Sequence, residues 1–335
     1  MLTRFHKGAD KRRPFSCFSF SLYLSPCLLP EHPDTLDTMS RLANAYSGLG
    51  RTSESRPLRD QLLALQKKAL GPENPSTLQT MTNLVQSYLQ QKRYSDAVAT
   101  ATEIWEIRKR VSGPEHADTL TAMGVVATAY AAHGRHSEAS ALWDKVLEVQ
   151  KRVLRAEHVS TLSTMGSLAA LQERSGDLKV AEALLRTLLA VSEKKKSDEF
   201  TQSSYRTRLG RVLVKEGKFA DAEPFLRSAL AVREKQAPDF WMTSVTRYVL
   251  GWSLAGQEKK AEAEPLLVAG AEGLLKEIAA LPELEHERVR EALGQLILLY
   301  TNWGKPEQAA AWQKKLDEFN TTHAPDSSGQ PPNPR

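Results

Sequence analysis

The chain has 335 residues, of which 41% are apolar and 25% are charged, and its formal net charge is +5. This composition is typical of globular proteins and excludes a largely disordered chain. Five basic residues and one acidic residue lie within residues 1–29, so the other 306 residues sum to only +1. A nucleic-acid-binding face needs clustered basic groups that neutralise phosphates. The net charge gives no evidence for such a face, and we expect no nucleic-acid partner.

Residues 1–29 differ from the rest of the chain, with a basic start and an apolar, serine-rich stretch from Phe15 to Leu29. Three interpretations stay open: a leader outside the native fold that results from a misplaced start or frame change, a signal peptide, and a membrane-associated segment. The stretch is too short for an ordinary membrane span and lacks an Ala-x-Ala cleavage site. We therefore expect a poorly ordered leader, no firm membrane association, and a cytoplasmic protein, with export as the alternative. Cys17 and Cys27 also lie here, and their spacing matches no zinc site.

From Pro30 onward the sequence repeats. The strings PEHPDTLDTM (30–39), PENPSTLQTM (72–81), PEHADTLTAM (114–123) and AEHVSTLSTM (156–165) recur every 42 residues. Four such strings in register indicate an array of structural repeats. The spacing later changes to 41 and finally 46 residues, so we count seven units between Pro30 and Phe319 and regard the last three as degenerate. Methionine occupies one shared position, at Met39, Met81, Met123 and Met165.

Each unit predicts two helices. In the second unit Ser76 is expected to open the first helix, with Gln79 completing a capping box. The second helix is expected to begin near Tyr94 and to end before Gly113 and Pro114. Its inward residues are predicted to be Ala97, Ala101, Ile104, Ile107 and Val111.

Two further positions recur between and within these helices. Glycine occupies the break between the two helices in five units, whereas Lys92 and Glu258 replace it in the other two. A small alanine follows, where a larger side chain would push two crossing helices apart. The glycines are Gly50, Gly134, Gly176, Gly217 and Gly304, and the alanines are Ala97, Ala139, Ala181, Ala222, Ala263 and Ala309.

Two helices per unit, with leucine, a small residue, tyrosine, glycine and alanine in that order, resemble the tetratricopeptide repeat (TPR). The 42-residue unit and its Pro-Glu-His-Pro-Asp-Thr-Leu linker are similar to the arrays of kinesin light chains and of many bacterial proteins. The resemblance covers residues 30 to about 319. It implies an all-α, right-handed α-solenoid of about seven helix–turn–helix repeats, whose units must stack to bury their apolar faces.

The same resemblance implies a mode of action. We expect a non-enzymatic scaffold or adaptor that binds a peptide or protein surface in a concave groove lined by the first helices. The alternative is a regulatory segment separated from a larger signalling enzyme, such as a bacterial serine/threonine kinase. In the first two units the groove is expected to present Asn44, Asn83 and Gln86, which suit hydrogen bonds to an extended peptide. The third and fourth units offer small residues, among them Ser167 and Ala170.

The fifth and sixth units carry the most distinctive candidate site. Arg208, Arg211 and Lys215 share one helical face, and Tyr248 and Trp252 take equivalent positions in the next unit. A basic stripe beside two aromatic residues could hold an acidic peptide with an aromatic or aliphatic anchor, as the resemblance to kinesin light chains also implies. The alternative is a solvated charged face and a packed tryptophan. Charge reversal at Arg208 and Arg211 is then expected to weaken binding of an acidic partner without lowering the melting temperature.

The chain ends with a predicted capping helix, Pro306–Phe319, and a disordered tail over residues 320–335. We find none of the common nucleotide-binding, serine-hydrolase or zinc-protease motifs, and we expect neither an enzyme nor a cofactor. His32, His116 and His158 recur in the linkers one repeat apart, so we interpret them as helix-entry residues and not as ligands of one metal ion. An exposed end of the array would allow self-association.

Overall fold

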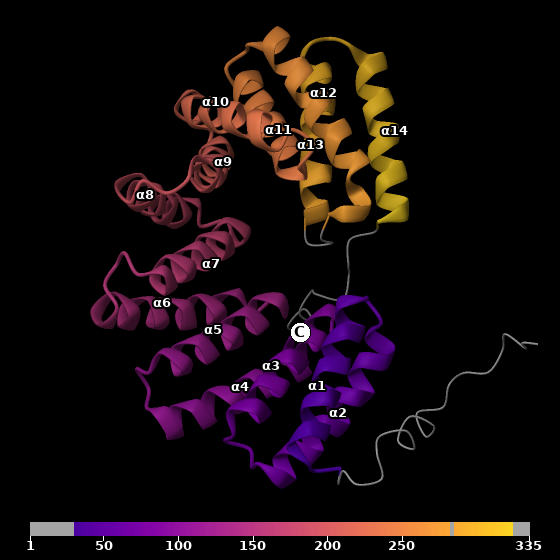
Figure 1. Ribbon diagram of the computed structural model, residues 1–335. Coiled ribbons are helices and arrows are strands. Elements are labelled where there is room, and N and C mark those ends of the chain that lie inside the picture. Colours follow the sequence, from indigo (N-terminus) through magenta and orange to yellow (C-terminus); the bar gives the residue numbers. More distant parts are fainter. Residues whose placement is uncertain (1–29, 282–284, 324–335) are drawn as a thin grey trace, which may run out of the picture. The chain divides into compact units, whose positions relative to one another are not determined.

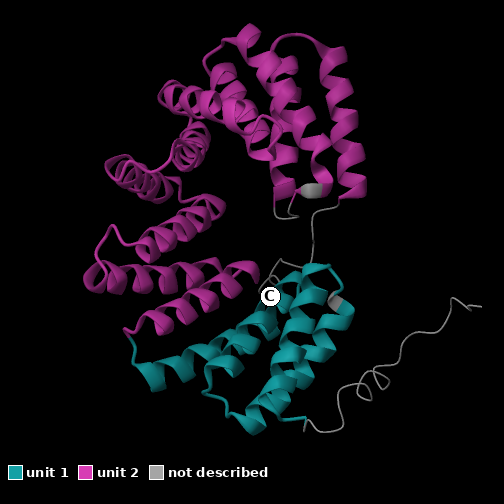
Figure 2. Cartoon of the chain, viewed as in Figure 1, with its two compact units in different colours: residues 1–114 teal, residues 115–335 magenta. Residues whose placement is uncertain are grey.

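The computed structural model describes residues 30–281 and 285–323 (Figure 1). Within these ranges all regular elements are helices, and no strand is present. The chain divides into two compact units, residues 1–114 and residues 115–335 (Figure 2). The division falls in the linker before the third predicted repeat. The leader, both cysteines and most of the expected C-terminal tail lie outside the described residues.

The helices form antiparallel pairs, two in the first unit and five in the second. The described helices therefore match the seven expected repeats. The first unit contains α1 (Pro33–Gly48), α2 (Thr52–Ala69), α3 (Pro75–Gln90) and α4 (Tyr94–Ser112). The second contains α5 (Ala117–Ala132), α6 (His136–Val153), α7 (Val159–Ser175), α8 (Leu178–Lys194), α9 (Glu199–Lys215), α10 (Phe219–Gln236), α11 (Trp241–Gly256), α12 (Lys260–Lys276), the short 3₁₀ helix η2 (Ile278–Ala280), α13 (His286–Asn302) and α14 (Pro306–Thr322).

The recurring histidines cap the first helix of their repeats. The Nδ1 atom of His116 accepts a hydrogen bond from the backbone nitrogen of Asp118, and His32 and His158 cap α1 and α7 in the same way. Their predicted role as helix-entry residues is confirmed. In the second repeat Asn74 takes this position and accepts from the backbone nitrogen of Ser76. The prediction that Ser76 begins the helix within a capping box is therefore wrong.

The turn between paired helices requires a left-handed backbone at one residue. The five recurring glycines all have positive φ, and so do the two residues that replace glycine, Lys92 at 57° and Glu258 at 62°. Because a side chain disfavours this conformation by about 1–2 kcal/mol, the turn imposes local strain at these two positions. The helix–turn–helix geometry therefore requires a positive φ at this position, whichever residue occupies it.

The apolar positions predicted from periodicity form the core. All four recurring methionines are buried, as are five of the six recurring alanines, while Ala309 is partly buried. Val111 is the exception, because its side chain is 54% exposed and does not point inward as expected. In the second unit one continuous apolar cluster extends from Leu147 to Phe319, in agreement with helix pairs that stack on one another.

The end of the chain differs slightly from expectation. Helix α14 continues to Thr322, three residues beyond the predicted end at Phe319. The longer spacing before the last repeat accommodates η2 between α12 and α13. Nowhere in the described ranges is a helix both long and apolar enough to cross a membrane.

Candidate functional site

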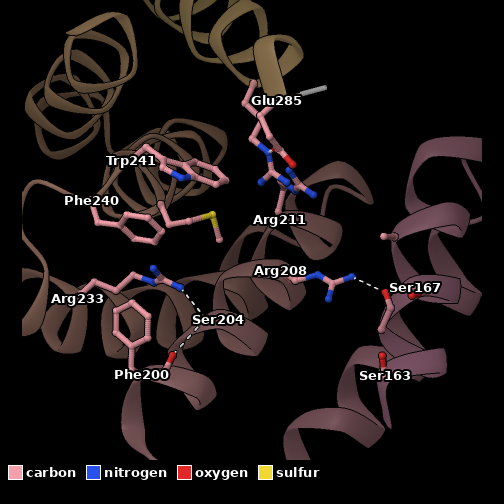
Figure 3. A pocket seen from close by; sticks show the side chains of 14 residues that line it. Ser163, Ser167, Phe200, Ser204, Arg208, Arg211, Arg233, Phe240, Trp241 and Glu285 are labelled. Carbon is pink, nitrogen blue, oxygen red and sulfur yellow. Dashed lines mark hydrogen bonds and ion pairs between the residues drawn. The ribbon is translucent and has the colours of Figure 1, made fainter. Parts of the chain in front are cut away.

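A pocket of about 690 Å³ opens in the second unit (Figure 3). Its walls come from α7, α9, α10, the start of α11 and the start of α13. Four arginines, three serines and three aromatic residues line it, together with one glutamate. The lining residues are Ser163, Gly166, Ser167, Ala170, Phe200, Ser204, Arg208, Arg211, Arg233, Phe240, Trp241, Met242, Glu285 and Arg288.

Arg211 lies at the inner wall and is held by a buried carboxylate. Its Nη2 atom donates to Oε2 of Glu173 on α7 at 2.6 Å, and both side chains are almost fully buried. Burial alone would lower the pKa of Arg211, but the charge of Glu173 and the neighbouring Tyr248 and Glu291 raise it overall. The arginine is therefore a permanently charged, structurally fixed part of the wall.

Arg208 lies one helical turn before Arg211 on α9 and reaches across to α7, as Figure 3 shows. Its Nη2 atom donates to the backbone oxygen of Gly166 at 2.8 Å. An added Cβ at Gly166 would lie 3.7 Å from Nη1 of Arg208, an ordinary van der Waals distance, so this contact does not depend on the glycine. Burial, followed by repulsion from Arg211, lowers the pKa of Arg208.

Arg233 comes from α10 and extends between the rings of Phe200 and Phe240 (Figure 3). Its guanidinium carbon lies 5.1 Å from the centre of the Phe200 ring, and Nη2 donates to the hydroxyl of Ser204 at 2.9 Å. Burial lowers the pKa of Arg233 to about 10. The side chain is only 1% exposed, and its Nε and Nη1 atoms have no hydrogen-bond partner within the described ranges.

The opposite wall combines aromatic rings with the fourth arginine. Phe240 and Trp241 lie at the start of α11, with ring centres 5.7 Å apart, and Phe240 is 41% exposed. The guanidinium group of Arg288 lies over the Trp241 ring at 5.7 Å and forms an ion pair with Glu285. The pocket thus offers an apolar, partly exposed surface beside a strongly cationic one.

Family models described as tetratricopeptide repeat match the sequence, one at residues 34–104 and 134–194 and a second at residues 203–235. The chain is a tetratricopeptide repeat protein. Its repeats are of the kinesin light chain type, because the chain is similar to the nearly identical TPR-like repeats of a kinesin-light-chain-like protein from Podospora anserina. That match has 25% sequence identity and a TM-score of 0.54, and covers 61% of this chain and 98% of the other.

Two other solved structures share the TPR fold over most of the chain. The apo form of RapI has 12% identity and a TM-score of 0.65, with 85% of this chain and 97% of the other covered. The apo form of the quorum sensor NprR from Bacillus thuringiensis has 13% identity and a TM-score of 0.55, with 90% and 91% covered. At these identities the likeness concerns the fold alone. No curated protein sequence matches the chain.

Of the five site residues predicted in the fifth and sixth repeats, the TPR structure brings only Arg208 and Arg211 to the pocket. Lys215 forms ion pairs with Glu173 and Glu291 behind the wall. Trp252 is partly buried against the apolar core and does not line the pocket. The prediction that Tyr248 lies on the exposed groove surface is wrong. Its side chain is fully buried, and its hydroxyl donates to Glu291 on α13 at 3.0 Å.

The predicted residues of the first two repeats lie in the first unit. Asn44 and Gln86 are exposed and Asn83 is half-buried. The side-chain oxygen of Asn44 accepts from Arg59 at 3.0 Å, and that of Asn83 accepts from Gln79 at 3.2 Å. Their binding role stays a prediction. Ser167 and Ala170, the small residues expected to leave room, do line the pocket of the second unit.

Sequence reasoning missed Arg233, Arg288 and the aromatic wall. Arg233 lies on the second helix of its repeat, whereas the groove was expected on first helices alone. Phe240 had a detectable signal, since it occupies the helix-cap position at which His32, His116 and His158 stand in other repeats. Phe240 makes no capping hydrogen bond, and its ring lines the pocket instead.

Proposed function

We propose that this TPR protein is a non-enzymatic adaptor that binds an acidic peptide or protein segment through the pocket of its second unit. The supporting observation is the combination of four arginines with a partly exposed aromatic wall in one pocket. Arginine suits carboxylate recognition because its planar guanidinium group donates several hydrogen bonds in a fixed geometry. Partly exposed aromatic rings suit an apolar anchor, since such residues dominate interface energetics.

A peptide series tests this proposal. The first peptide carries acidic residues on both sides of a central tryptophan, the second has the corresponding amides, and the third has glycine instead of tryptophan. We expect the acidic tryptophan peptide to bind the full chain at least about tenfold more tightly than either analogue, a difference of about 1.4 kcal/mol. Binding should weaken only modestly as salt increases, because salt screens buried and partly buried charges less than exposed ones.

Two variants with matched controls assign the binding to the pocket. Arg208→Gln removes a pocket cation, and Arg206→Gln removes a cation from the same helix outside the pocket. Phe240→Ala removes part of the aromatic wall, and Leu298→Ala truncates another exposed apolar side chain outside the pocket. The proposal requires weaker binding in the first variant of each pair only. Equal affinity of the acidic and amide peptides, or normal binding by both pocket variants, would refute it.

A further inference from the structure

Two of the four pocket arginines have no carboxylate partner among the described residues. Arg208 donates to a backbone oxygen and Arg233 donates to the Ser204 hydroxyl. Arg211 is paired with Glu173, and Arg288 is paired with Glu285. The pocket therefore contains two guanidinium groups that form no ion pair with a described acid.

The more buried of these charges is Arg233. Its Nε and Nη1 atoms are enclosed by protein atoms and make no hydrogen bond to any described residue. A buried charge without a partner is unfavourable, and it acts strongly on nearby ligands because protein surroundings screen it less than water does. An anion in the pocket would lower this cost. Arg233 therefore favours anionic ligands more strongly than an exposed arginine would.

The hydrogen-bonding groups of the wall also favour an anion with several oxygens. Ser163 and Ser167 on α7 add hydroxyl groups to the guanidinium groups, while the Ser204 hydroxyl donates to the backbone oxygen of Phe200. Glu285 is the sole carboxylate among the described lining residues. A phosphate monoester carries a charge of about −1.5 to −2 near neutral pH and three terminal oxygens. A carboxylate carries a single charge and two oxygens. Two guanidinium groups without an ion-pair partner match the phosphate better.

The aromatic wall adds a second requirement. Phe240 and Trp241 lie beside the cationic part of the pocket, and the Phe200 and Phe240 ring centres are 6.3 Å apart. Aromatic rings pack well against other rings in tilted or offset arrangements. A ligand that carries its anionic group on an aromatic ring would therefore contact both parts of the pocket.

We propose that the pocket of the second unit binds a phosphotyrosine side chain of a partner peptide, with the phosphate against Arg208 and Arg233 and the ring against Phe240 and Trp241. This inference depends on the proposed peptide-binding function and specifies the chemistry of its anchor. One modified residue then supplies both the acidic group and the aromatic group that the pocket accommodates.

Small probes test the proposal directly by calorimetric titration of the full chain. The probes are N-acetyl-O-phosphotyrosine amide, N-acetyltyrosine amide, N-acetylglutamate amide, inorganic phosphate and adenosine monophosphate. We expect the phosphotyrosine probe to bind at least about tenfold more tightly than each of the others. Equal binding of the glutamate probe would overturn the preference for phosphate. Equal or tighter binding of adenosine monophosphate would overturn the peptide source of the phosphate.

Variants locate the binding and separate it from unfolding. Arg233→Met and Arg208→Gln should each lower the affinity for the phosphotyrosine probe at least about tenfold, while the control Arg206→Gln should bind the probe with unchanged affinity. Arg233→Met should also raise the melting temperature, because it removes a buried, unneutralised charge. If Arg233→Met fails to fold, Arg208→Gln still decides the question. Normal binding by Arg208→Gln, or by a folded Arg233→Met, would overturn the proposal.

The peptide series distinguishes the two levels of inference. If the acidic tryptophan peptide binds through the pocket and the phosphotyrosine probe does not, the adaptor function stands and the phosphotyrosine site is wrong. If both bind, the phosphotyrosine probe should compete with the acidic peptide, because they occupy the same arginines. If neither binds, the proposed function itself fails.

Discussion

Arg211 on α9 donates to Glu173 on α7 at 2.6 Å, and both side chains of this ion pair are almost fully buried. Lys215 adds a second cation 3.4 Å from the same carboxylate. The pair therefore fixes the inner wall of the pocket from two helices. It also changes how charge reversal at Arg208 and Arg211 should be interpreted, since a carboxylate at position 211 would lie against Glu173. Loss of stability in that double variant would reflect Arg211 and would say nothing about ligand binding.

Removal of one partner of the buried pair should be costly. Glu173→Gln leaves the Arg211 charge buried without a carboxylate, and such losses are typically about 3–5 kcal/mol. The free energy of unfolding in urea measures the effect. Glu193→Gln is the control, because Glu193 on α8 is exposed and pairs with Arg206 on α9, the helix that also carries Arg211. The control should lose at most about 1 kcal/mol. Similar losses in the two variants would contradict the structural role of the Arg211–Glu173 pair.

A fall in pH should lower the stability of the second unit, because two of its glutamates become protonated. Hydrogen bonds from Lys218 lower the pKa of Glu182 to about 2, and those from Lys259 lower the pKa of Glu223 to about 2, from a usual value of 4.5. Because the folded-state pKa values are depressed, their stabilisation is complete above pH 4.5 and is lost as the pH falls toward 2. These side chains are close to solvent, so we expect about 1 kcal/mol from each.

The glutamate effect can be isolated with a double variant. In Glu182→Gln/Glu223→Gln neither side chain titrates, so urea unfolding midpoints should fall less between pH 5 and pH 2.5 than in the unmodified chain. An equally steep fall in both proteins would show that other carboxylates cause the acid sensitivity.

The histidine caps predict a second kind of stability effect. His116→Ala leaves the backbone nitrogen of Asp118 without its 3.2 Å acceptor and should cost about 1 kcal/mol. His116→Asn reproduces the cap that Asn74 provides in the second repeat and should retain or increase stability. Thermal unfolding and amide exchange at Asp118 measure both changes. An Asn variant as unstable as the Ala variant would mean that the histidine ring contributes by packing and not by capping.

Much of the fold could be predicted because the 42-residue period marks the positions where helices begin, cross and turn. The positive φ at Lys92 and Glu258 shows the strength of this information, since the turn is retained without its glycine. The pocket was harder to predict. Periodicity within one helix identifies a shared face but cannot tell which neighbouring helix covers it. Tyr248 and Trp252 share a face of α11 by spacing, yet the first is completely buried and the second only in part.

The glycines of α12 explain why Tyr248 is buried. Helix α12 carries Gly270 and Gly273 toward α11, and a Cβ atom at Gly270 would lie 2.6 Å from the backbone nitrogen of Tyr248. The close approach of α11 and α12 therefore depends on the missing side chain. A pair of glycines inside an otherwise regular helix was the signal available in the sequence, because glycine weakens a helix unless close packing requires it.

Gly270→Ala should therefore destabilise the second unit, although alanine favours helices more than glycine. The added methyl group meets backbone atoms that cannot move without shifting α11, so we expect a loss of about 1–3 kcal/mol in the free energy of unfolding. Gly294→Ala is the matched control, since Gly294 is also inside a helix but no heavy atom of a neighbouring element lies within 4 Å of the added Cβ. This control should gain about 0.4–1 kcal/mol, because alanine restricts the unfolded chain and fits the helical backbone. Opposite signs for the two substitutions would confirm that α11 and α12 are held together at Gly270, whereas stabilisation by both would show that the helices can separate without cost.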